Sequence, residues 1–232
     1  MNLALFDFDG TITSRDTFKP FLYFAAPRRV AFAALLAPLV AAHRAGWVPT
    51  TRLRAAGAYV AFRGRGEQEL TELGAGYAQT LPALVRTEAL DKIRWHQAEG
   101  DRVVVVSASL HPYLSVWCRT VGVELICTEL EVRGGRLTGR YRGGDCTGHE
   151  KARRVRERYE LARYPIIYAY GDTPEDAELL GLAHRRYYRW QEQSADGRNP
   201  GVDPRAVEPL VVEQVSPGQG AVDQGAVEQP RR

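Results

Sequence analysis

The chain alternates between short, continuous apolar runs and longer segments in which apolar residues have helical spacing. Three runs, at 3–6, 103–106 and 166–170, consist almost entirely of aliphatic and aromatic residues and are bounded by polar or turn-forming residues. Runs of this kind are typical of strands that are buried on both faces of a parallel sheet. Because helical segments separate them, the pattern predicts an α/β fold with a doubly wound parallel sheet.

The same patterns predict further elements between and after these strands. A long helical region extends over 16–99, and two short strands about Gly134-Gly135 form a hairpin within 131–141. The remaining predicted elements are helices at 111–120, 150–161 and 174–180 and strands at 123–127 and 186–190.

The end of the chain has a different composition. From Gln191 onwards the sequence is rich in Gly, Pro, Gln, Val and acidic residues and has no hydrophobic periodicity. Such segments bury too little apolar surface to fold on their own. We therefore expect a largely disordered tail over 191–232, after one main domain that carries a second small lobe.

Composition and charge narrow the function without defining it. The 232 residues are 44% hydrophobic with a formal net charge of +3, of which residues 1–190 carry +6 and residues 191–232 carry −3. This modest positive excess suits an anionic substrate and is too small to indicate a nucleic-acid partner. The three cysteines have no CxxC spacing and no secretion signal precedes the first strand, so we expect a reducing, cytoplasmic location.

Two carboxylates stand directly after the first strand, in the sequence Asp7-Phe8-Asp9. Residues two apart on a strand point to the same side, so we expect Asp7 and Asp9 to direct both charges into one small volume. The repulsion between them is tolerated where a cation offsets it or where a shifted pKa serves the chemistry.

Other polar residues lie at the predicted carboxyl edge of the sheet, where ligands bind in open α/β folds. They are Ser107 after the second strand, Asp172 after the strand at 166–170, Asp176 one turn into the next helix, and Lys151 in the first turn of the helix at 150–161. The two acids could instead cap helices, and Ser107 could be an ordinary turn residue. Lys151 fits neither alternative, because a cation opposes the dipole at a helix N-terminus.

Together these residue types form a set suited to phosphate chemistry. Carboxylates can hold Mg²⁺, a further carboxylate can attack phosphorus, and a hydroxyl and an ammonium can bind phosphoryl oxygens. Phosphomonoester hydrolysis is among the slowest uncatalysed reactions and needs neutralisation of charge in its transition state. The set therefore indicates a Mg²⁺-dependent enzyme that acts on a phosphomonoester.

Four segments, in this order, resemble the motifs of the haloacid dehalogenase-like (HAD) phosphohydrolase superfamily. They are DFDGT at 7–11, VVVVSAS at 103–109, GHEKARRV at 148–155 and YGDTPEDAELL at 170–180. The chain looks most similar to subfamily IB, the branch with phosphoserine phosphatase and phosphatidylglycerophosphate phosphatase-like enzymes.

The resemblance implies catalytic roles for the first two carboxylates. Asp7 would be the nucleophile that forms an aspartyl-phosphate. Asp9 would protonate the leaving group and then act as the base for the water that cleaves the intermediate. Related cation-pumping ATPases have Thr at the Asp9 position, so the acid here favours a phosphatase over a pump.

The resemblance also implies binding roles for the other motif residues. The phosphoryl group would be bound by Ser107, Lys151 and Thr11. The Mg²⁺ ion would be held by Asp7, the backbone carbonyl of Asp9 and Asp172, with Asp176 in support.

The domain organisation follows from the same resemblance. Residues 1–15 and 87–190 would form the catalytic core, and residues 16–86 would form a helical cap inserted after the first strand. Closing such a cap would exclude water until the intermediate has formed.

Two residues bear on the substrate. Asp16 stands where phosphoserine phosphatases have a Glu that binds the substrate amine, and Ser109 ends the SAS segment after the second strand. Both are candidates for substrate specificity. The shorter side chain of Asp16 makes phosphoserine a less suitable substrate.

The expected cap contains an apolar run, Val30–Ala42, flanked by Arg28-Arg29 and His43-Arg44. The run is too short to span a bilayer, which takes about 20 residues. Basic flanks around apolar residues suit the anionic inner face of a membrane, and peripheral contact there would suit a lipid phosphate such as phosphatidylglycerophosphate. The alternative is a helix pair buried within the cap.

Other functions remain open from the sequence. They are a phosphatase of a soluble metabolite such as phosphoserine and a phosphotransferase that uses the same aspartyl-phosphate. A non-catalytic receiver-like module is a weaker alternative, because it has no cap-sized insertion and little use for Asp9. The sequence indicates no oligomeric state.

Overall fold

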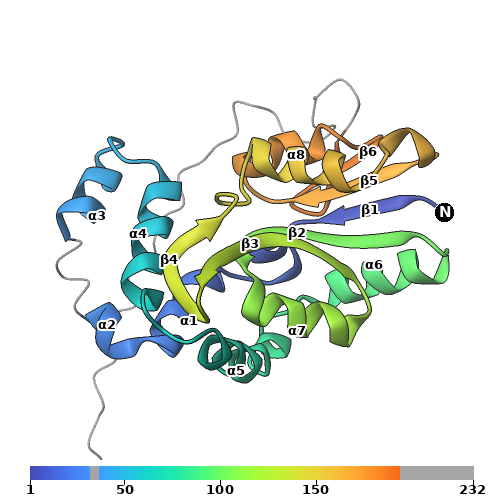
Figure 1. Cartoon of the computed structure of the whole chain (residues 1–232). Coiled ribbons are helices and arrows are strands. Elements are labelled where there is room, and N and C mark those ends of the chain that lie inside the picture. Colours follow the sequence, from blue (N-terminus) through green and yellow to red (C-terminus); the bar gives the residue numbers. More distant parts are fainter. Residues whose placement is uncertain (32–36, 194–232) are drawn as a thin grey trace, which may run out of the picture. The chain divides into compact units, whose positions relative to one another are not determined.

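The computed structural model of the chain describes residues 1–31 and 37–193. Within these residues a seven-stranded sheet has the strand order β4-β3-β2-β1-β5-β6-β7 (Figure 1). The five central strands, β3-β2-β1-β5-β6, run parallel to one another. The edge strands β4 and β7 are antiparallel to their neighbours. This confirms the expected α/β fold with a doubly wound, mostly parallel sheet. The strands are β1 (Leu3–Phe6), β2 (Arg102–Leu110), β3 (Glu124–Arg133), β4 (Arg136–Arg142), β5 (Ile167–Gly171), β6 (Arg185–Tyr188) and β7 (Gln191–Gln193).

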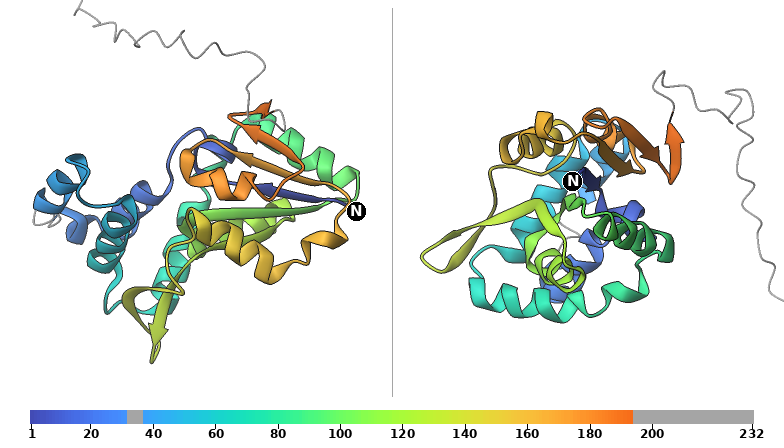
Figure 2. Two further views of the ribbon diagram at one scale, coloured as in Figure 1. Left: turned by 90° about the horizontal axis from the view of Figure 1, so that it is seen from above. Right: turned by 90° about the vertical axis from the view of Figure 1, so that its right-hand side faces the viewer.

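The central strands are apolar throughout because both of their faces are covered. Successive side chains of a strand point to opposite sides of the sheet, so Leu3 and Leu5 belong to one core cluster and Ala4 and Phe6 to another. The first cluster includes residues of α8 (His149–Arg158) and α9 (Ala177–Leu180), and the second includes residues of α6 (Thr87–Ala98) and α7 (His111–Val121). Figures 1 and 2 show α8 on one side of the sheet and α6 and α7 on the other.

Helices fill the interval between β1 and β2, as the sequence predicts. Before α6 these are α1 (Phe18–Ala25), α2 (Pro27–Ala31), α3 (Ala37–Arg44), α4 (Thr50–Phe62) and α5 (Glu67–Ala78), with a short 3₁₀ turn at Leu81–Ala83. Two further 3₁₀ turns, Leu161–Arg163 and Pro174–Asp176, lie later in the chain. α1 buries residues at positions i, i+3, i+4 and i+7, namely Phe18, Phe21, Leu22 and Ala25. Helix α5 packs against α7, and α4 packs against β4. We call residues 16–86 the helical lobe, and its division from the core as a separate cap remains a prediction.

Part of the apolar run Val30–Ala42 lies outside the described residues, which omit 32–36. Its expected contact with a membrane therefore remains a prediction. None of the helices in residues 1–31 and 37–193 is long and apolar enough to cross a membrane.

The strand predicted at 123–127 and the first strand of the predicted hairpin are one continuous strand, β3. Its first half pairs in parallel with β2, from Glu124 to Thr128, and its second half pairs antiparallel with β4, from Glu129 to Arg133. The sequence pattern suggested two strands because β3 changes its pairing partner halfway along its length.

The predicted start of the disordered tail, Gln191, is too early in the sequence, because Gln191–Gln193 forms a strand. Two residues with positive φ, Arg189 (51°) and Trp190 (66°), reverse the chain after β6. Gln191–Gln193 then pairs antiparallel with β6 as β7, and Arg185 in β6 forms an ion pair with Glu192 (2.7 Å). The rest of the predicted tail, 194–232, lies outside the described residues.

Candidate active site

The carboxyl ends of β1, β2 and β5 bring the predicted site residues to one edge of the sheet. Asp7 follows β1 directly, and its N–H donates to the carbonyl of Tyr170 in β5 (2.9 Å). Asp172 follows β5, and Ser107 lies in β2 just before the irregular end of that strand. Segments that are far apart in the sequence thus meet where open α/β sheets bind ligands.

A kinked turn over Phe8–Ile12 carries the chain away from β1. Gly10 in this turn has a φ of +85°, and a Cβ atom there would come within 2.2 Å of Oδ2 of Asp172. Only glycine fits both the left-handed backbone and this close approach. Gly10 therefore allows the turn after β1 to lie directly against the Asp172 carboxylate.

Lys151 joins two of the carboxylates. Its ammonium lies 2.5 Å from Oδ1 of Asp7 and 2.6 Å from Oδ1 of Asp176, and only 3% of the Lys151 side chain is exposed. Lys151 lies in the first turn of α8, where its charge opposes the helix dipole. The two carboxylates supply the negative charge that offsets this unfavourable position, and such charge-assisted hydrogen bonds fix the position of all three side chains.

Asp176 divides its two oxygens between Lys151 and the backbone. Its Oδ2 accepts hydrogen bonds from the N–H groups of Asp172 (3.1 Å) and Thr173 (3.0 Å) and from the Thr173 hydroxyl (3.0 Å). These bonds belong to a capping box at the helix start Pro174–Asp176. Asp176 therefore completes the cap at this helix start, and the same side chain also contacts Lys151.

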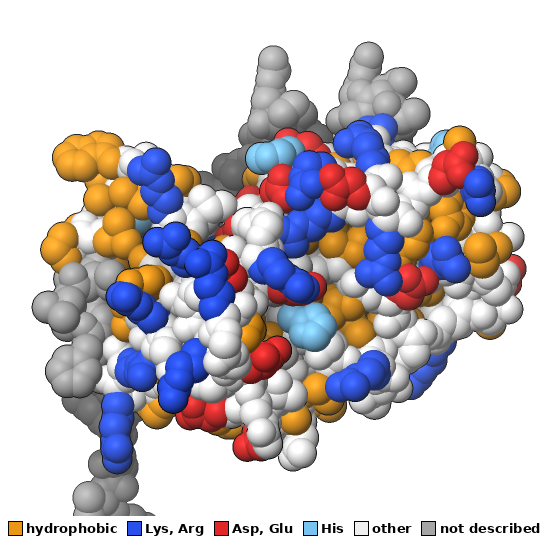
Figure 3. All heavy atoms as spheres, in the orientation of Figure 1, with side chains coloured by type: hydrophobic (Ala, Val, Ile, Leu, Met, Phe, Trp, Pro, Cys, Tyr) orange, Lys and Arg blue, Asp and Glu red, His pale blue; other side chains and the backbone are white. Residues whose placement is uncertain are grey.

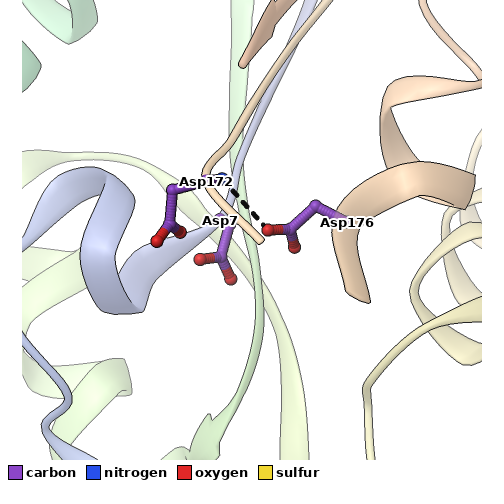
Figure 4. A group of neighbouring side chains, drawn as sticks. All are labelled: Asp7, Asp172 and Asp176. Carbon is purple, nitrogen blue, oxygen red and sulfur yellow. Dashed lines mark hydrogen bonds between the residues drawn. The ribbon is translucent and has the colours of Figure 1, made fainter. Parts of the chain in front are cut away.

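Three carboxylates converge on one point at this edge. Asp7, Asp172 and Asp176 each offer an oxygen, and these atoms all lie within 4.8 Å of one another. Figure 4 shows the three side chains directed towards a common space, with Asp176 also bonded to the backbone of Asp172. Hard oxygen donors at this spacing fit a small divalent cation such as Mg²⁺. When all three carboxylates are ionised, the single ammonium leaves an excess of negative charge that such a cation would offset.

Asp9 has partners of its own. Its Oδ1 accepts hydrogen bonds from the N–H (2.7 Å) and the hydroxyl (2.6 Å) of Thr17, and its Oδ2 accepts one from the Ser109 hydroxyl. The expectation that Asp7 and Asp9 share one strand face needs correction, because β1 ends at Phe6 and the two carboxylates have different partners. The structure thus separates a carboxylate bound to an ammonium from one held by neutral donors.

A buried hydroxyl network that the sequence did not predict surrounds Asp9. The Thr17 hydroxyl lies 3.1 Å from the Tyr113 hydroxyl, and Tyr77 donates to the Thr17 carbonyl (3.0 Å). Thr17 and Tyr113 are fully buried. The two tyrosines come from α5 and α7, so packing of the lobe against the core creates the network. In the sequence, only the position of Thr17 next to Asp16, a predicted specificity residue, pointed to this region.

A partly buried ion pair joins the helical lobe to the core near Asp9. Arg54 in α4 donates through Nε to Oδ2 of Asp145 (3.1 Å) and also donates to the carbonyl of Ala108. Asp145 accepts a further hydrogen bond from the Thr128 hydroxyl (3.1 Å). The sequence analysis missed both members, because neither stands in a motif and the pair spans 91 positions.

Four other predicted residues form hydrogen bonds within the protein, and their expected roles remain predictions. The Thr11 hydroxyl donates to Oδ1 of Asp172 (2.9 Å), and Ser107 Oγ accepts a hydrogen bond from the N–H of Ser109 (3.0 Å). Asp16 accepts hydrogen bonds from the N–H groups of Phe18 (3.2 Å) and Lys19 (3.3 Å) at the start of α1. Asp16 thus caps α1, and Ser109 contacts Asp9.

Burial sets the protonation of the carboxylates. It raises the pKa of Asp7 to about 8, even though Lys151 acts in the opposite direction. Burial also raises the pKa of Asp9 and of Asp172. At Asp176 burial raises the pKa, but Lys151 and the two backbone N–H groups outweigh it and the pKa is lowered. The shift of the Asp9 pKa is in the direction that a general acid needs.

Comparison with known proteins agrees with this geometry. The family model described as haloacid dehalogenase-like hydrolase matches residues 4–181. The protein CicA of Caulobacter vibrioides is 32% identical over 195 residues, which cover 81% of this chain and 85% of CicA. A Bordetella pertussis protein of unknown function has a similar structure, with a TM-score of 0.68, 23% identity and coverage of 81% and 89%. A structure of phosphoserine phosphatase with an analogue of its phospho-aspartyl intermediate has a TM-score of 0.56, 17% identity and coverage of 81% and 85%.

The sheet order and the cluster of strand-end carboxylates define an α/β protein with a candidate active site at the carboxyl edge of a doubly wound sheet. The chain belongs to the haloacid dehalogenase-like hydrolase family.

Proposed function

We propose that this enzyme is a Mg²⁺-dependent phosphomonoester hydrolase that works through an aspartyl-phosphate on Asp7, and that it belongs to subfamily IB. The observation that carries the proposal is the contact of one buried ammonium, Lys151, with both Asp7 and Asp176, beside a separately held Asp9. Two carboxylates in different surroundings can perform different steps of one reaction.

In the first step an Asp7 carboxylate oxygen attacks phosphorus. The bond between Asp7 and phosphorus forms, the bond between phosphorus and the leaving alcohol breaks, and Asp9 gives its proton to the alcohol oxygen. Thr17 and Ser109 hold the Asp9 carboxyl in one orientation through its two oxygens. The raised pKa of Asp9, caused by burial, supports its role as the acid.

In the second step water cleaves the aspartyl-phosphate. Asp9, now a carboxylate, takes a proton from the water as its oxygen attacks phosphorus, and the bond to Asp7 breaks to release inorganic phosphate. The Lys151 ammonium and the Ser107 hydroxyl would bind the phosphoryl oxygens in both steps. The ammonium has three N–H donors, and the contacts with Asp7 and Asp176 use two of them, so one is left for a phosphoryl oxygen.

The donor set fits Mg²⁺ held by Asp7 and Asp172, with the carbonyl of Asp9 as a further ligand and Asp176 in support. Bound Mg²⁺ would supply positive charge that lowers the pKa of Asp7 and neutralises the phosphoryl oxygens. The Thr11 hydroxyl orients Asp172 through its hydrogen bond, and its binding of phosphate remains part of the proposal.

For the substrate we propose a lipid phosphate, such as phosphatidylglycerophosphate, ahead of a soluble ester. Both oxygens of Asp16 accept backbone hydrogen bonds at the start of α1, so Asp16 is poorly placed to bind the amine of phosphoserine. The basic flanks of the run Val30–Ala42 favour an anionic membrane as the source of the substrate.

A release assay for inorganic phosphate tests the proposal. Purified enzyme would be given lipid phosphates in detergent micelles, amino-acid phosphates and sugar phosphates, with Mg²⁺ and with EDTA. We expect turnover that needs Mg²⁺, disappears in Asp7→Asn and is fastest with the lipid phosphates. Equal activity in Asp7→Asn would refute the nucleophile, and turnover of soluble esters alone would refute the lipid substrate.

A further inference from the structure

The helical lobe contains a segment in which all charges have one sign. Residues 17–66 hold eight Lys and Arg and no Asp or Glu, whereas the rest of the chain holds 23 basic and 28 acidic residues. The net charge of the whole protein, +3, hides this difference. A positive surface of this kind attracts anionic partners.

Most of these positive charges are not neutralised within the protein. Arg54 pairs with Asp145 and Arg65 pairs with Glu69. The other six form no ion pair with a carboxylate in the described part of the chain, and these are Lys19, Arg28, Arg29, Arg44, Arg52 and Arg63. All six are exposed, so their charge is available to a partner.

The same segment exposes large aromatic side chains. Four of the six large hydrophobic residues that are exposed in the described part of the chain lie here: Tyr23, Phe24, Trp47 and Tyr59. Trp47 is the most exposed of them, at 82%. Tryptophan and tyrosine rings beside basic residues are typical of protein surfaces that lie at the headgroup level of a membrane.

The backbone holds Trp47 in its exposed position. Helix α3 ends in a Schellman motif, in which Gly46 (φ +78°) donates to the carbonyl of His43 (2.9 Å) and Trp47 donates to the carbonyl of Ala42 (2.9 Å). The side chain at the Trp47 position of this motif usually packs against the helix, but its partner here is the small Ala42. His43 Nδ1 also bonds the carbonyl of Val48 (2.8 Å), so the ring stands out from an ordered turn.

Basic residues flank this tryptophan on both sides. Arg44 lies in the last turn of α3 and Arg52 in the first turn of α4, and α3 and α4 pack against each other. Figure 3 shows blue and orange side chains over α3 and α4, whereas the red side chains gather over other parts of this face. An inserted aromatic ring with a rim of guanidinium groups fits an anionic bilayer.

We propose that the α3–α4 hairpin is a docking surface for anionic phospholipid bilayers, with Trp47 inserted among the headgroups and Arg44 and Arg52 paired with lipid phosphates. The proposed function enters this inference at one point: it explains why docking would be useful, because docking brings the active site to a lipid phosphate. It concerns a surface of the lobe and no residue of the catalytic site.

Vesicle sedimentation tests the docking surface with the full chain. Two vesicle types would be used, pure phosphatidylcholine and equal parts of phosphatidylcholine and phosphatidylglycerol. We expect binding to the anionic vesicles and little to the neutral ones. Trp47→Ala should weaken binding about tenfold, and Arg44→Gln and Arg52→Gln about fivefold each at low salt.

Matched variants outside the lobe serve as controls. Trp95→Ala removes an exposed tryptophan of α6, and Arg133→Gln and Arg163→Gln remove exposed arginines of the core. These variants should bind anionic vesicles as the unchanged protein does. All variants should hydrolyse a soluble aryl phosphate at the same rate, because none of the substituted residues lies in the catalytic site.

Three outcomes would contradict the proposed docking surface. They are absence of binding by the unchanged protein, equal binding to both vesicle types, and unchanged binding by Trp47→Ala. Competition by duplex DNA without dependence on Trp47, or a dimer that Trp47→Ala dissociates, would assign the surface to a different partner. If the protein hydrolyses soluble phosphates but ignores vesicles, the docking surface fails and the proposed reaction stands. If it binds vesicles but releases no phosphate, the reaction fails and the docking surface stands.

Discussion

The ammonium of Lys151 lies 2.5 Å from Oδ1 of Asp7, and both side chains are almost completely buried. A buried cation in contact with the proposed nucleophile holds that carboxylate in one position and keeps a positive charge where phosphoryl oxygens would lie. The same ammonium contacts Asp176, so one residue of α8 links the ends of β1 and β5.

Replacing Lys151 by Met should affect both catalysis and stability. The change leaves Asp7 and Asp176 buried without a cationic partner, so we expect the free energy of unfolding to fall by about 3 kcal/mol. The loss of phosphoryl binding should lower kcat/KM at least about 100-fold. Urea unfolding and initial rates measure the two effects. Lys92→Met, which removes a lysine that lies over the Trp95 ring, is the control, and equal behaviour of the two variants would contradict the role of Lys151.

The role of Asp9 as general acid can be separated from binding by varying the leaving group. An alkyl alcohol needs a proton as it departs, whereas a nitrophenolate leaves readily without one. Asp9→Asn should therefore lower kcat/KM, which reports the first step, much more for an alkyl phosphate than for p-nitrophenyl phosphate. Thr17→Val keeps the side-chain volume but removes the hydroxyl bond to Asp9, and we expect the same selectivity with a smaller loss. An equal loss of kcat/KM for both substrates would contradict the role of Asp9 as the acid of the first step.

Gly10 offers a test of the geometry around Asp172. A Cβ atom at Gly10 would lie 2.2 Å from Oδ2 of Asp172, so Gly10→Ala must displace this carboxylate. We expect the Mg²⁺ concentration for half-maximal activity to rise about tenfold or more. Gly100→Ala is the matched control, because Gly100 also has a positive φ (+71°) but no atom lies within 4 Å of a Cβ built there. Parallel Mg²⁺ titrations of the two variants should differ, and identical curves would rule out the assigned contact.

A buried histidine makes the stability depend on pH. His96 is fully buried, with Nδ1 2.9 Å from Asp101 and Nε2 2.9 Å from the Tyr170 hydroxyl. Burial lowers the pKa of His96 below its usual value of 6.5. Below about pH 6.5 the unfolded chain therefore binds a proton that the folded chain does not, and the free energy of unfolding falls as the pH falls.

Asp101 acts in the same direction at lower pH. Burial raises its pKa, but hydrogen bonds from His96 and the N–H of Asn2 outweigh burial and lower it, so its contribution is also lost on acidification. Urea unfolding at pH 7.5 and 5.5 measures the slope. His96→Gln should reduce the difference between the two pH values, whereas His149→Gln, at an exposed site, should not. An unchanged slope in His96→Gln would show that another group causes it.

The sequence predicted the strands and the carboxyl edge because burial imposes a local pattern. Runs such as 3–6 and 103–106 are apolar throughout since the sheet covers both of their faces, and residues that follow such strands must lie at one edge. Asp7, Asp172, Asp176 and Lys151 could therefore be placed together before the fold was described.

The partners of these residues could not be predicted in the same way. The contacts of Asp9 with Thr17 and Ser109 depend on how the turn after β1 leaves the sheet, and strand geometry gave the wrong expectation there. The ion pair of Arg54 with Asp145 depends on the packing of α4 against the core. No local pattern marks these residues, because their spacing in the sequence is unrelated to their distance in space.

The central claim is that Asp7 carries the phosphoryl group during turnover. Enzyme that is mixed with substrate and Mg²⁺ and denatured in acid within one turnover should retain a phosphoryl group on the peptide that contains Asp7, and mass spectrometry of the digest would detect it. Asp7→Asn should show no such peptide, and Asp9→Asn should retain more of the modified form, because water is no longer activated to cleave it. Release of phosphate at the normal rate with no phosphorylated Asp7 peptide would contradict the account.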